Sequence, residues 1–321
     1  MIDLIIPYYN NPEGLERTLA SIDHNIFYVT IIDDHSDKIP VNPTADQVFR
    51  YNQNEGPGYA RQWGIMKTSN PYIMFIDAGD TFVSWKVQQT ILEAVEDNPD
   101  ENVIQFSYYY NGEVTKETDN RMHGKIYKRE FIEKYRITFP CGTSWMNEDI
   151  GFNRTCRLCT KTENKPFLFI DIPVINWIKE ENSLTQKDNQ EMLYKWQTWS
   201  LSVASAYCID MCRLNGVDVE EEIHEIAVAL YYWFIRIVAE RPKYMEDAWC
   251  GASLFYLHYK KEINPNKLLV GNAYIKKCIK YRNKIPFPIN ILRFAHDIYL
   301  EEIPKIYYGG DTNEEVCKAD C

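Results

Sequence analysis

The stretch from Ile73 to Asp80 places the strongest constraint on how this chain can fold. Residues Ile73–Ile76 form an apolar run of strand length that ends in two carboxylates, Asp77 and Asp80, with a glycine between them. Such a run predicts a buried strand of a parallel sheet with both acids at its carboxyl end. Ligands bind at that edge of open α/β sheets, where acids hold a divalent cation or hydrogen-bond ribose hydroxyls. The alternative is a plain strand-end turn, because Asp and Gly are common turn residues.

Acids follow a second apolar segment in the same way. The segment Phe27–Ile32 is followed by Asp33 and Asp34, and an earlier one, Ile2–Ile6, is followed by a loop that starts at Pro7. Since parallel strands present their carboxyl ends at one edge of a sheet, the acids after both strands are expected to share one site.

Strand-length and helix-length segments alternate over the first hundred residues. This order predicts an α/β fold with a mainly parallel sheet and helices on both faces. Two segments that flank Asn111 and Gly112 predict a hairpin at a mixed edge of that sheet. The expected strands are 2–6, 27–32, 48–51, 73–76, 103–110, 114–118, 167–170 and 173–177; one helix begins at Pro12, another ends near residue 68 and a third spans 85–98.

Three further charged residues stand near the starts of predicted helices. Arg61 lies in the first turns of the helix that ends near residue 68, where the helix dipole favours anions. A ligand or an ion pair would explain this cation, and an ordinary surface arginine is the alternative. Glu148 and Asp149 precede another predicted helix, whose dipole favours their ionised form. That environment suits a general base as well as a simple helix cap.

The composition changes near residue 189. Aromatic and aliphatic residues then recur at helical spacing, which predicts an all-helical region 189–321 after a first domain 1–188. The longest apolar stretch, 226–239, is shorter than the roughly 20 residues that cross a bilayer, so it predicts a buried helix. The expected helices are 189–214, 218–240, 244–261, 266–282 and 289–301.

Charge and cysteine usage narrow the class of protein. A net charge of -11 disfavours a nucleic acid partner. The chain starts with a strand-like segment instead of a leader peptide, so a cytoplasmic location, free or peripheral to a membrane, is expected. The 9 cysteines then favour reduced thiols. Cys156 and Cys159 have the spacing of a zinc knuckle, but no second pair with that spacing follows, so buried thiols are the favoured interpretation.

Five short motifs, taken in order, resemble the family 2 glycosyltransferases. They are Ile-Ile-Pro-Tyr-Tyr-Asn at 5–10, the acid-rich strand end at 31–37, the segment 54–65 with Asn-Glu-Gly and Ala-Arg-Gln-Trp-Gly-Ile, Asp-Ala-Gly-Asp at 77–80 and Asn-Glu-Asp at 147–149. Segments 124–129 and 181–185 resemble further parts of the bacterial or phage polysaccharide-type members. The resemblance covers about residues 1–187 and leaves the helical region unassigned.

This resemblance implies the A-type glycosyltransferase fold, inversion at the anomeric carbon, a Mn²⁺ or Mg²⁺ ion, and a nucleotide-sugar donor, with a UDP-sugar as the first expectation. Carried over by position, Pro7, Tyr8 and Asn10 would line the nucleotide pocket. Asp34 would meet the base, and Arg61 would lie near the base or the diphosphate.

The remaining roles fall on carboxylates. The resemblance implies that Asp77 contacts the ribose or the cation and that Asp149 is the general base, with Glu148 as the second candidate. The chain departs from the family pattern at Gly79, where many members have a metal-binding acid, so Asp80 or Asp77 would take over that contact. It departs again at Glu180, where many have a histidine. Glu180 is therefore either a metal ligand or an exposed acid.

Several functions remain open at this level. The first is transfer of a sugar to a glycan or polysaccharide precursor, with the helical region shaping the acceptor site or an oligomer contact. The others are a catalytically silent relative that binds glycans or assembles with a partner, and a glycosyltransferase acting on modified DNA bases, which the net charge disfavours. A sugar nucleotidyltransferase would need a glycine-rich phosphate loop after the first strand, where this chain has Pro-Tyr-Tyr-Asn-Asn.

Overall fold

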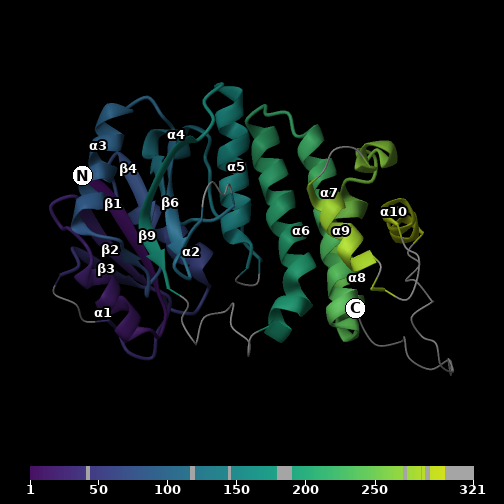
Figure 1. Cartoon of the computed structure of the whole chain (residues 1–321), viewed down its shortest axis with the longest axis horizontal. Coiled ribbons are helices and arrows are strands. Elements are labelled where there is room, and N and C mark those ends of the chain that lie inside the picture. Colours follow the sequence, from purple (N-terminus) through teal and green to yellow (C-terminus); the bar gives the residue numbers. More distant parts are fainter. Residues whose placement is uncertain are drawn as a thin grey trace. The chain divides into compact units, whose positions relative to one another are not determined.

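A computed structural model describes residues 1–40, 44–115, 120–143, 146–178, 190–269, 273–282, 284–285 and 290–300 (Figure 1). The chain divides into two compact units. The first comprises Met1–Leu193 and Val203–Val219, and the second comprises Tyr194–Ser202 and Glu220–Cys321. Helix α6 (Gln190–Leu214) therefore contributes residues to both units.

The first unit is built on one mixed sheet, which the described residues form in the order β3-β2-β1-β4-β8-β6-β9-β5, with β7 paired to β6. The strands are β1 (Ile2–Tyr8), β2 (Phe27–Asp33), β3 (Gln47–Arg50), β4 (Tyr72–Phe75), β5 (Thr81–Phe82), β6 (Val103–Tyr110), β7 (Glu113–Thr115), β8 (Lys125–Lys128) and β9 (Leu168–Trp177). Strands β3, β2, β1 and β4 are parallel, whereas β8 runs antiparallel to both of its neighbours. The predicted α/β fold with a mixed sheet is confirmed.

Helices cover both faces of the parallel strands. All seven residues of β1 are buried, as expected for an inner strand between two helical layers. On one face, Leu4 lies in a core cluster with Leu15 of α1 (Pro12–Ala20) and Ile91 of α3 (Trp85–Asp97). On the other face, Ile5 meets Gly64 of α2 (Pro57–Lys67). Alternate residues of β1 thus anchor different helices.

Gly64 leaves no room for a side chain, because a Cβ there would lie 2.3 Å from Cγ2 of buried Ile5. Replacing Gly64 by alanine should therefore destabilise the protein by about 1–3 kcal/mol through overpacking, which opposes the gain of about 1 kcal/mol in helix propensity. Urea unfolding would measure the change. The double variant with Ile5→Ala should lose less stability than the sum of the two single variants, and strict additivity would contradict this contact.

The described helices are α1, α2, α3, α4 (Arg129–Lys134), α5 (Glu148–Thr162) and α6, then α7 (Glu220–Glu240), α8 (Met245–His258), α9 (Ala273–Arg282) and α10 (Ile291–Tyr299), with short 3-10 helices at Pro242–Tyr244 and Pro265–Leu269. The second unit is helical, as predicted. Its core includes Phe294 of α10, whose ring packs on Phe234 of α7 and Trp249 of α8. None of the helices within the described ranges combines the length and apolarity needed to cross a bilayer.

The sheet differs from the predicted one in three ways. The two strands expected at 167–170 and 173–177 are one strand, β9, whose register against β6 shifts beside Pro173. A bulge of this kind breaks the alternation that a sequence pattern needs. Strands β5 and β8 were not predicted. The hairpin of β6 and β7 is confirmed, and its turn has positive φ at Asn111 (51°) and Gly112 (80°).

A buried ion pair joins three elements at the start of β1. Asp3 is fully buried, and its Oδ2 lies 2.8 Å from Nη2 of Arg129. Asn70 donates from its backbone N–H (2.8 Å) and its side-chain amide (2.7 Å) to the same carboxylate. Arg129 also donates to the carbonyls of Asn70 and Ile65 and to the Thr68 hydroxyl. Every charge in this network therefore has hydrogen-bonding partners.

The described cysteines are free thiols: Cys156, Cys159, Cys208, Cys212 and Cys278 are buried, and Cys141 and Cys250 are exposed. Burial raises the pKa of Cys156 well above its usual value and that of Cys278 to about 12. Such thiols stay protonated at neutral pH, which makes them poor metal ligands. The buried-thiol interpretation of Cys156 and Cys159 agrees with this environment.

Candidate active site

The carboxyl ends of β1, β2 and β4 meet at one edge of the sheet, because these three strands are parallel neighbours (Figure 1). Asp34 follows β2, and Asp77 and Asp80 follow β4. Arg61 reaches this edge from α2, and Glu148 and Asp149 reach it from the first turn of α5. Segments that lie far apart in the chain thus contribute to one site.

Arg61 links the acids of two elements. Its side chain is buried, with Nη2 2.7 Å from Oδ1 of Asp77 and Nη1 2.9 Å from Oε1 of Glu148. Burial opposes the charge of Arg61, but the two carboxylates outweigh it and raise its pKa. The same guanidinium, together with His123, outweighs desolvation at Asp77 and lowers the pKa of that carboxyl. The ion-pair interpretation of Arg61 is therefore correct, and the surface-arginine alternative is wrong.

Glu148 and Asp149 are adjacent but lie in different environments. Glu148 is buried and tied to Arg61, and burial followed by repulsion from Asp149 raises its pKa to about 7. Asp149 is half-buried, and its Oδ1 accepts a hydrogen bond from the N–H of Ile150 (2.8 Å). Burial also raises the pKa of Asp149, against the opposing charge of Arg61. Asp149 is thus the more accessible carboxylate, and Glu148 is the one held in place.

Asp77, Asp80 and His123 form a candidate metal centre. Each of the three side chains offers one potential ligand atom, and these atoms all lie within 4.8 Å of one another. Among the described residues, no other group of three or more acid, histidine or cysteine side chains meets this criterion. Asp80 is only 2% exposed, and its Oδ1 accepts the N–H of Ile178 at 2.9 Å. Its Oδ2 lies 3.2 Å from Nε2 of His123. Burial raises the pKa of Asp80.

Unsatisfied atoms indicate that this centre fits a cation. Oδ2 of Asp80 and both ring nitrogens of His123 are buried. Oδ2 and Nε2 face each other at 3.2 Å without the geometry of a hydrogen bond, and Nδ1 has no hydrogen-bonding partner within the described residues. Buried polar atoms without partners are rare and call for an explanation, and a bound ion supplies one. Two carboxylates with one imidazole suit Mn²⁺ better than Mg²⁺, which prefers oxygen ligands alone.

His123 was not among the predicted ligands. It precedes β8, and its ring packs against the rings of Tyr108 (5.2 Å) and Trp177 (4.6 Å), so its position depends on how β6, β8 and β9 pair. A lone histidine carries no ligand spacing that a sequence pattern could reveal. The predicted ligand Glu180 lies outside the described residues.

The backbone accounts for the glycine between the two acids. Gly79 has a φ of 123°, a conformation that residues with a Cβ rarely adopt. Its N–H donates to Oγ1 of Thr18, and its carbonyl accepts from Nε of Arg17. An acid at this position would strain the turn, which is consistent with the metal ligands being drawn from its neighbours.

The predicted nucleotide-binding residues lie at the ends of β1 and β2. Pro7 and Tyr8 close β1 and are buried, and exposed Asn10 accepts from the N–H of Asp37 at 2.8 Å. Asp34 is buried, and its two oxygens accept from backbone N–H groups of the loop that begins α2, at 2.8 and 2.7 Å. Asp34 therefore fixes that loop. Its contact with a base stays a prediction.

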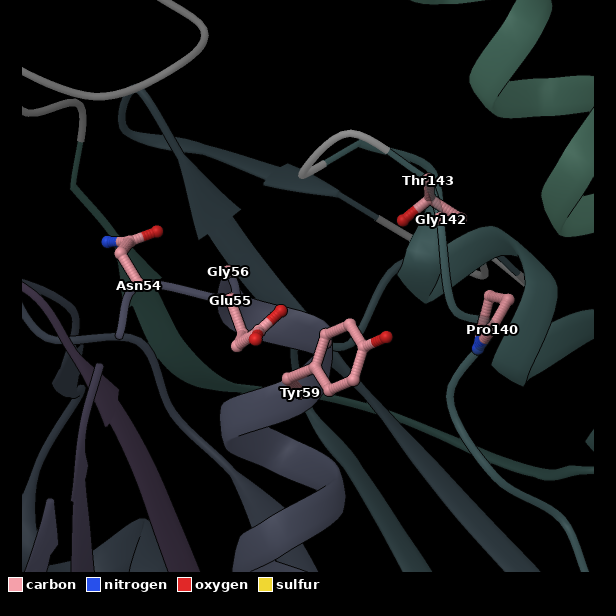
Figure 2. A pocket seen from close by; sticks show the side chains of 8 residues that line it. Asn54, Glu55, Gly56, Tyr59, Pro140, Gly142 and Thr143 are labelled. Carbon is pink, nitrogen blue, oxygen red and sulfur yellow. The ribbon is translucent and has the colours of Figure 1, made fainter. Parts of the chain in front are cut away.

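A cavity of about 310 Å³ opens beside the start of α2. Figure 2 shows the Tyr59 ring and the Glu55 carboxylate between Asn54 on one side and Pro140 on the other. The cavity borders the Arg61 cluster, because a Cβ at lining residue Gly58 would touch Cγ of Glu148 at 2.9 Å. The lining residues are Asn54, Glu55, Gly56, Gly58, Tyr59, Pro140, Gly142 and Thr143. Sequence patterns did not single out Tyr59 or Thr143.

The sequence of the first unit matches a known family. Residues 3–152 match the family model described as glycosyl transferase family 2. Residues 3–152 form a family 2 glycosyltransferase domain. The resemblance noted in the five motifs is thereby confirmed.

Relatives named as glycosyltransferases match part of this chain. An uncharacterized glycosyltransferase of Rickettsia conorii is 33% identical in an alignment over 106 residues, which covers 30% of this chain and 18% of that protein. One of Haemophilus influenzae is 28% identical in an alignment over 111 residues, which covers 32% of this chain and 37% of that protein. The chain thus spans well under half the length of these relatives.

The fold extends beyond the family 2 domain. TarS 1–349 of S. aureus, solved in complex with UDP-GlcNAc, matches with a TM-score of 0.64 over 95% of this chain and 93% of that chain, at 14% sequence identity. At this identity the likeness shows the fold alone. The A-type glycosyltransferase fold followed by a helical region is therefore confirmed.

Proposed function

We propose that this protein is an inverting glycosyltransferase that moves a sugar from a UDP-sugar to an acceptor hydroxyl of a glycan or polysaccharide precursor. The observation that carries the proposal is the pairing of accessible Asp149 with Glu148 held by Arg61, next to the Asp77, Asp80 and His123 centre. The family 2 domain supports glycosyl transfer, and the UDP-GlcNAc complex of TarS supports a UDP-sugar as donor.

Asp149 would act as the general base. An alcohol is a poor nucleophile near neutral pH, so a carboxylate that accepts its proton as it attacks the sugar speeds the reaction. Burial raises the pKa of Asp149, which makes its ionised form a stronger base than that of an exposed aspartate. Glu148 and Asp77 are both paired with Arg61, so in this proposal neither carboxylate takes the acceptor proton.

A divalent cation fits the neighbouring centre. Asp80 and His123, with Asp77 as a third ligand, would hold it, and it would neutralise charge that develops on the leaving diphosphate. Packing against Tyr108 and Trp177 fixes the His123 ring, and the N–H of Ile178 fixes the Asp80 carboxylate. Such supporting contacts orient ligands before the ion binds.

Calorimetry with UDP-, GDP-, dTDP- and CDP-sugars, in Mn²⁺ or in EDTA, tests the donor and the cation together. We expect a UDP-sugar to bind in Mn²⁺ and to lose at least tenfold in affinity in EDTA. In Mn²⁺, Asp80→Asn and His123→Ala should bind the nucleotide-sugar as weakly as the wild type binds it in EDTA. His24→Ala, at an exposed histidine, should bind it as the wild type does.

Two results would count against this assignment. Equal donor affinity in Mn²⁺ and EDTA would remove the cation from the proposal while leaving transfer intact. If a folded protein bound none of the four nucleotide-sugar classes, the catalytically silent relative would become the better description.

The pH dependence of transfer separates the two adjacent acids. With Asp149 as the base, kcat/KM should fall as the pH drops and Asp149 becomes protonated. Burial and the charge of Asp149 raise the pKa of Glu148 to about 7, so Glu148 loses its charge before Asp149 is protonated as the pH drops. Replacing Glu148 by glutamine should therefore leave the acid limb where it is in the wild type. Buffers from pH 4 to 9 would record the profile. Loss of the acid limb in Glu148→Gln would mean that Glu148, and not Asp149, is the base.

A further inference from the structure

A second cavity, of about 530 Å³, lies at the carboxyl ends of β6 and β9. These strands are parallel neighbours, and Tyr109 of β6 pairs with Asn176 of β9 in their register. The cavity is lined by Tyr109, Asn111, Gly112, Asn176, Trp177 and Ile178. Its volume falls within the roughly 300–1,000 Å³ that small-molecule sites occupy.

Two residues that line this cavity also contact the ligands of the candidate metal centre. The N–H of Ile178 donates to Asp80, and the Trp177 ring stacks on His123 at 4.6 Å. Asp77 of that centre pairs with Arg61, which also pairs with Glu148, the neighbour of the proposed base. A molecule in the cavity would therefore lie beside the cation ligands, which the Arg61 ion pairs connect to the segment that carries the proposed base.

The cavity lies on the side of the site away from the predicted nucleotide pocket. In the sheet order, β4 and β8 separate β6 from β1, and β2 lies beyond β1. Asp80, which follows β4, lies between the two sides. An inverting transfer needs this arrangement, since the acceptor attacks from the side opposite the leaving diphosphate.

The lining has the chemistry of a sugar site. Among the described residues it contains two aromatic rings and two carboxamides but no charged side chain. Aromatic rings pack against apolar faces, and an asparagine amide both donates to and accepts from hydroxyls. A charged ligand would need a side chain of opposite charge in the lining, whereas an uncharged sugar does not.

Tyr109 and Asn111 are the side chains left available to a ligand. The Trp177 ring already packs against His123, Tyr110 (4.3 Å) and the Arg121 guanidinium (4.7 Å), and the amide of Asn176 donates to Thr81. In the described part of the chain, the side chains of Tyr109 and Asn111 make no such contact. The tight turn at Asn111 and Gly112 fixes the backbone that carries this amide.

We propose that this cavity is the acceptor subsite and that it takes an uncharged sugar ring. Tyr109 packs against the apolar face of the ring, and the amide of Asn111 hydrogen-bonds its hydroxyls. The proposal rests on the proposed function, because a sugar bound beside the cation ligands has a role as acceptor only if the protein transfers a sugar to it.

Saturation-transfer NMR with methyl glycosides of glucose, galactose, mannose, N-acetylglucosamine and rhamnose tests the subsite. At least one glycoside should bind, and Tyr109→Ala should raise its dissociation constant about tenfold. Asn111→Gly removes the amide but keeps a residue suited to the left-handed turn, and it should weaken binding similarly. Val114→Ala, at the exposed partner of Tyr109 in the hairpin, is the control and should bind as the wild type does.

Calorimetry of UDP-GlcNAc with the same variants separates this proposal from the proposed function. Variants that lose the glycoside but keep the nucleotide-sugar support the acceptor subsite. Loss of both ligands would overturn it and assign the cavity to the donor sugar. Absence of binding by every glycoside at tens of millimolar, or unchanged binding in Tyr109→Ala and Asn111→Gly, would also overturn it. Glycoside binding without nucleotide-sugar binding would leave the cavity as a sugar-binding site, but it would remove the proposed transfer and with it the acceptor role.

Discussion

Replacing Asp149 by asparagine is expected to lower kcat for sugar transfer by about 10²–10⁴-fold and to leave the donor dissociation constant nearly unchanged. The amide keeps the shape of the side chain and the hydrogen bond that its oxygen accepts from Ile150, but it cannot take the acceptor proton. Radiolabelled sugar incorporation would measure kcat, and calorimetry would measure donor binding. Together they separate a loss of chemistry from a loss of substrate.

Glu148→Gln is the matched control, because it makes the same chemical change one residue away. Its amide oxygen still accepts from Arg61, so transfer should persist with the acid limb of the wild type. If Glu148→Gln abolished transfer and Asp149→Asn retained it, the base would be Glu148. Loss of donor binding in Asp149→Asn would instead move Asp149 to the donor site.

The largest expected loss of stability follows from removing one partner of the buried ion pair of Asp3 and Arg129. Asp3→Ala leaves the Arg129 guanidinium buried without its carboxylate and leaves two donors of Asn70 unsatisfied. Breaking a buried pair in this way costs about 3–5 kcal/mol. Urea unfolding followed by tryptophan fluorescence would show the transition of the first unit at a lower denaturant concentration.

Two companion variants test the cause. Asp100→Ala removes an exposed acid and should change stability by less than about 0.5 kcal/mol. Combining Asp3→Leu with Arg129→Met replaces the whole pair by apolar side chains, which should recover much of the loss. A double variant as unstable as Asp3→Ala would show that the backbone contacts of Arg129, and not its charge, hold this region together.

Much of the fold can be predicted from local sequence. The helix α1 illustrates this, because Asn11 caps its start through the N–H of Gly14 and Pro12 occupies its first turn, as their positions predict. The carboxylates at the ends of β2 and β4 also follow from pattern alone, since apolar runs that stop at acids place those acids at the strand ends. Local sequence rules suffice wherever the conformation of a residue depends mainly on its neighbours in the sequence.

Features that depend on pairing between distant strands were not predictable. His123 reaches Asp80 because the pairing of β8, β6 and β9 brings it against Tyr108 and Trp177, and no spacing in the sequence predicts this contact. The continuity of β9 through its bulge depends likewise on its register with β6. Glu148 and Asp149 could be ranked as candidates for the base only once the position of Arg61 was known, because Arg61 pairs with Glu148 and leaves Asp149 more accessible.

The cysteines offer a way to follow the two units in solution. Cys141 belongs to the first unit and Cys250 to the second, and both are exposed, whereas the other described thiols are buried. Once Cys317 and Cys321, outside the described residues, are changed to serine, nitroxide labels should attach at these two native positions. Electron paramagnetic resonance would then give the distance between the labels with and without a nucleotide-sugar, and so report whether donor binding moves one unit against the other.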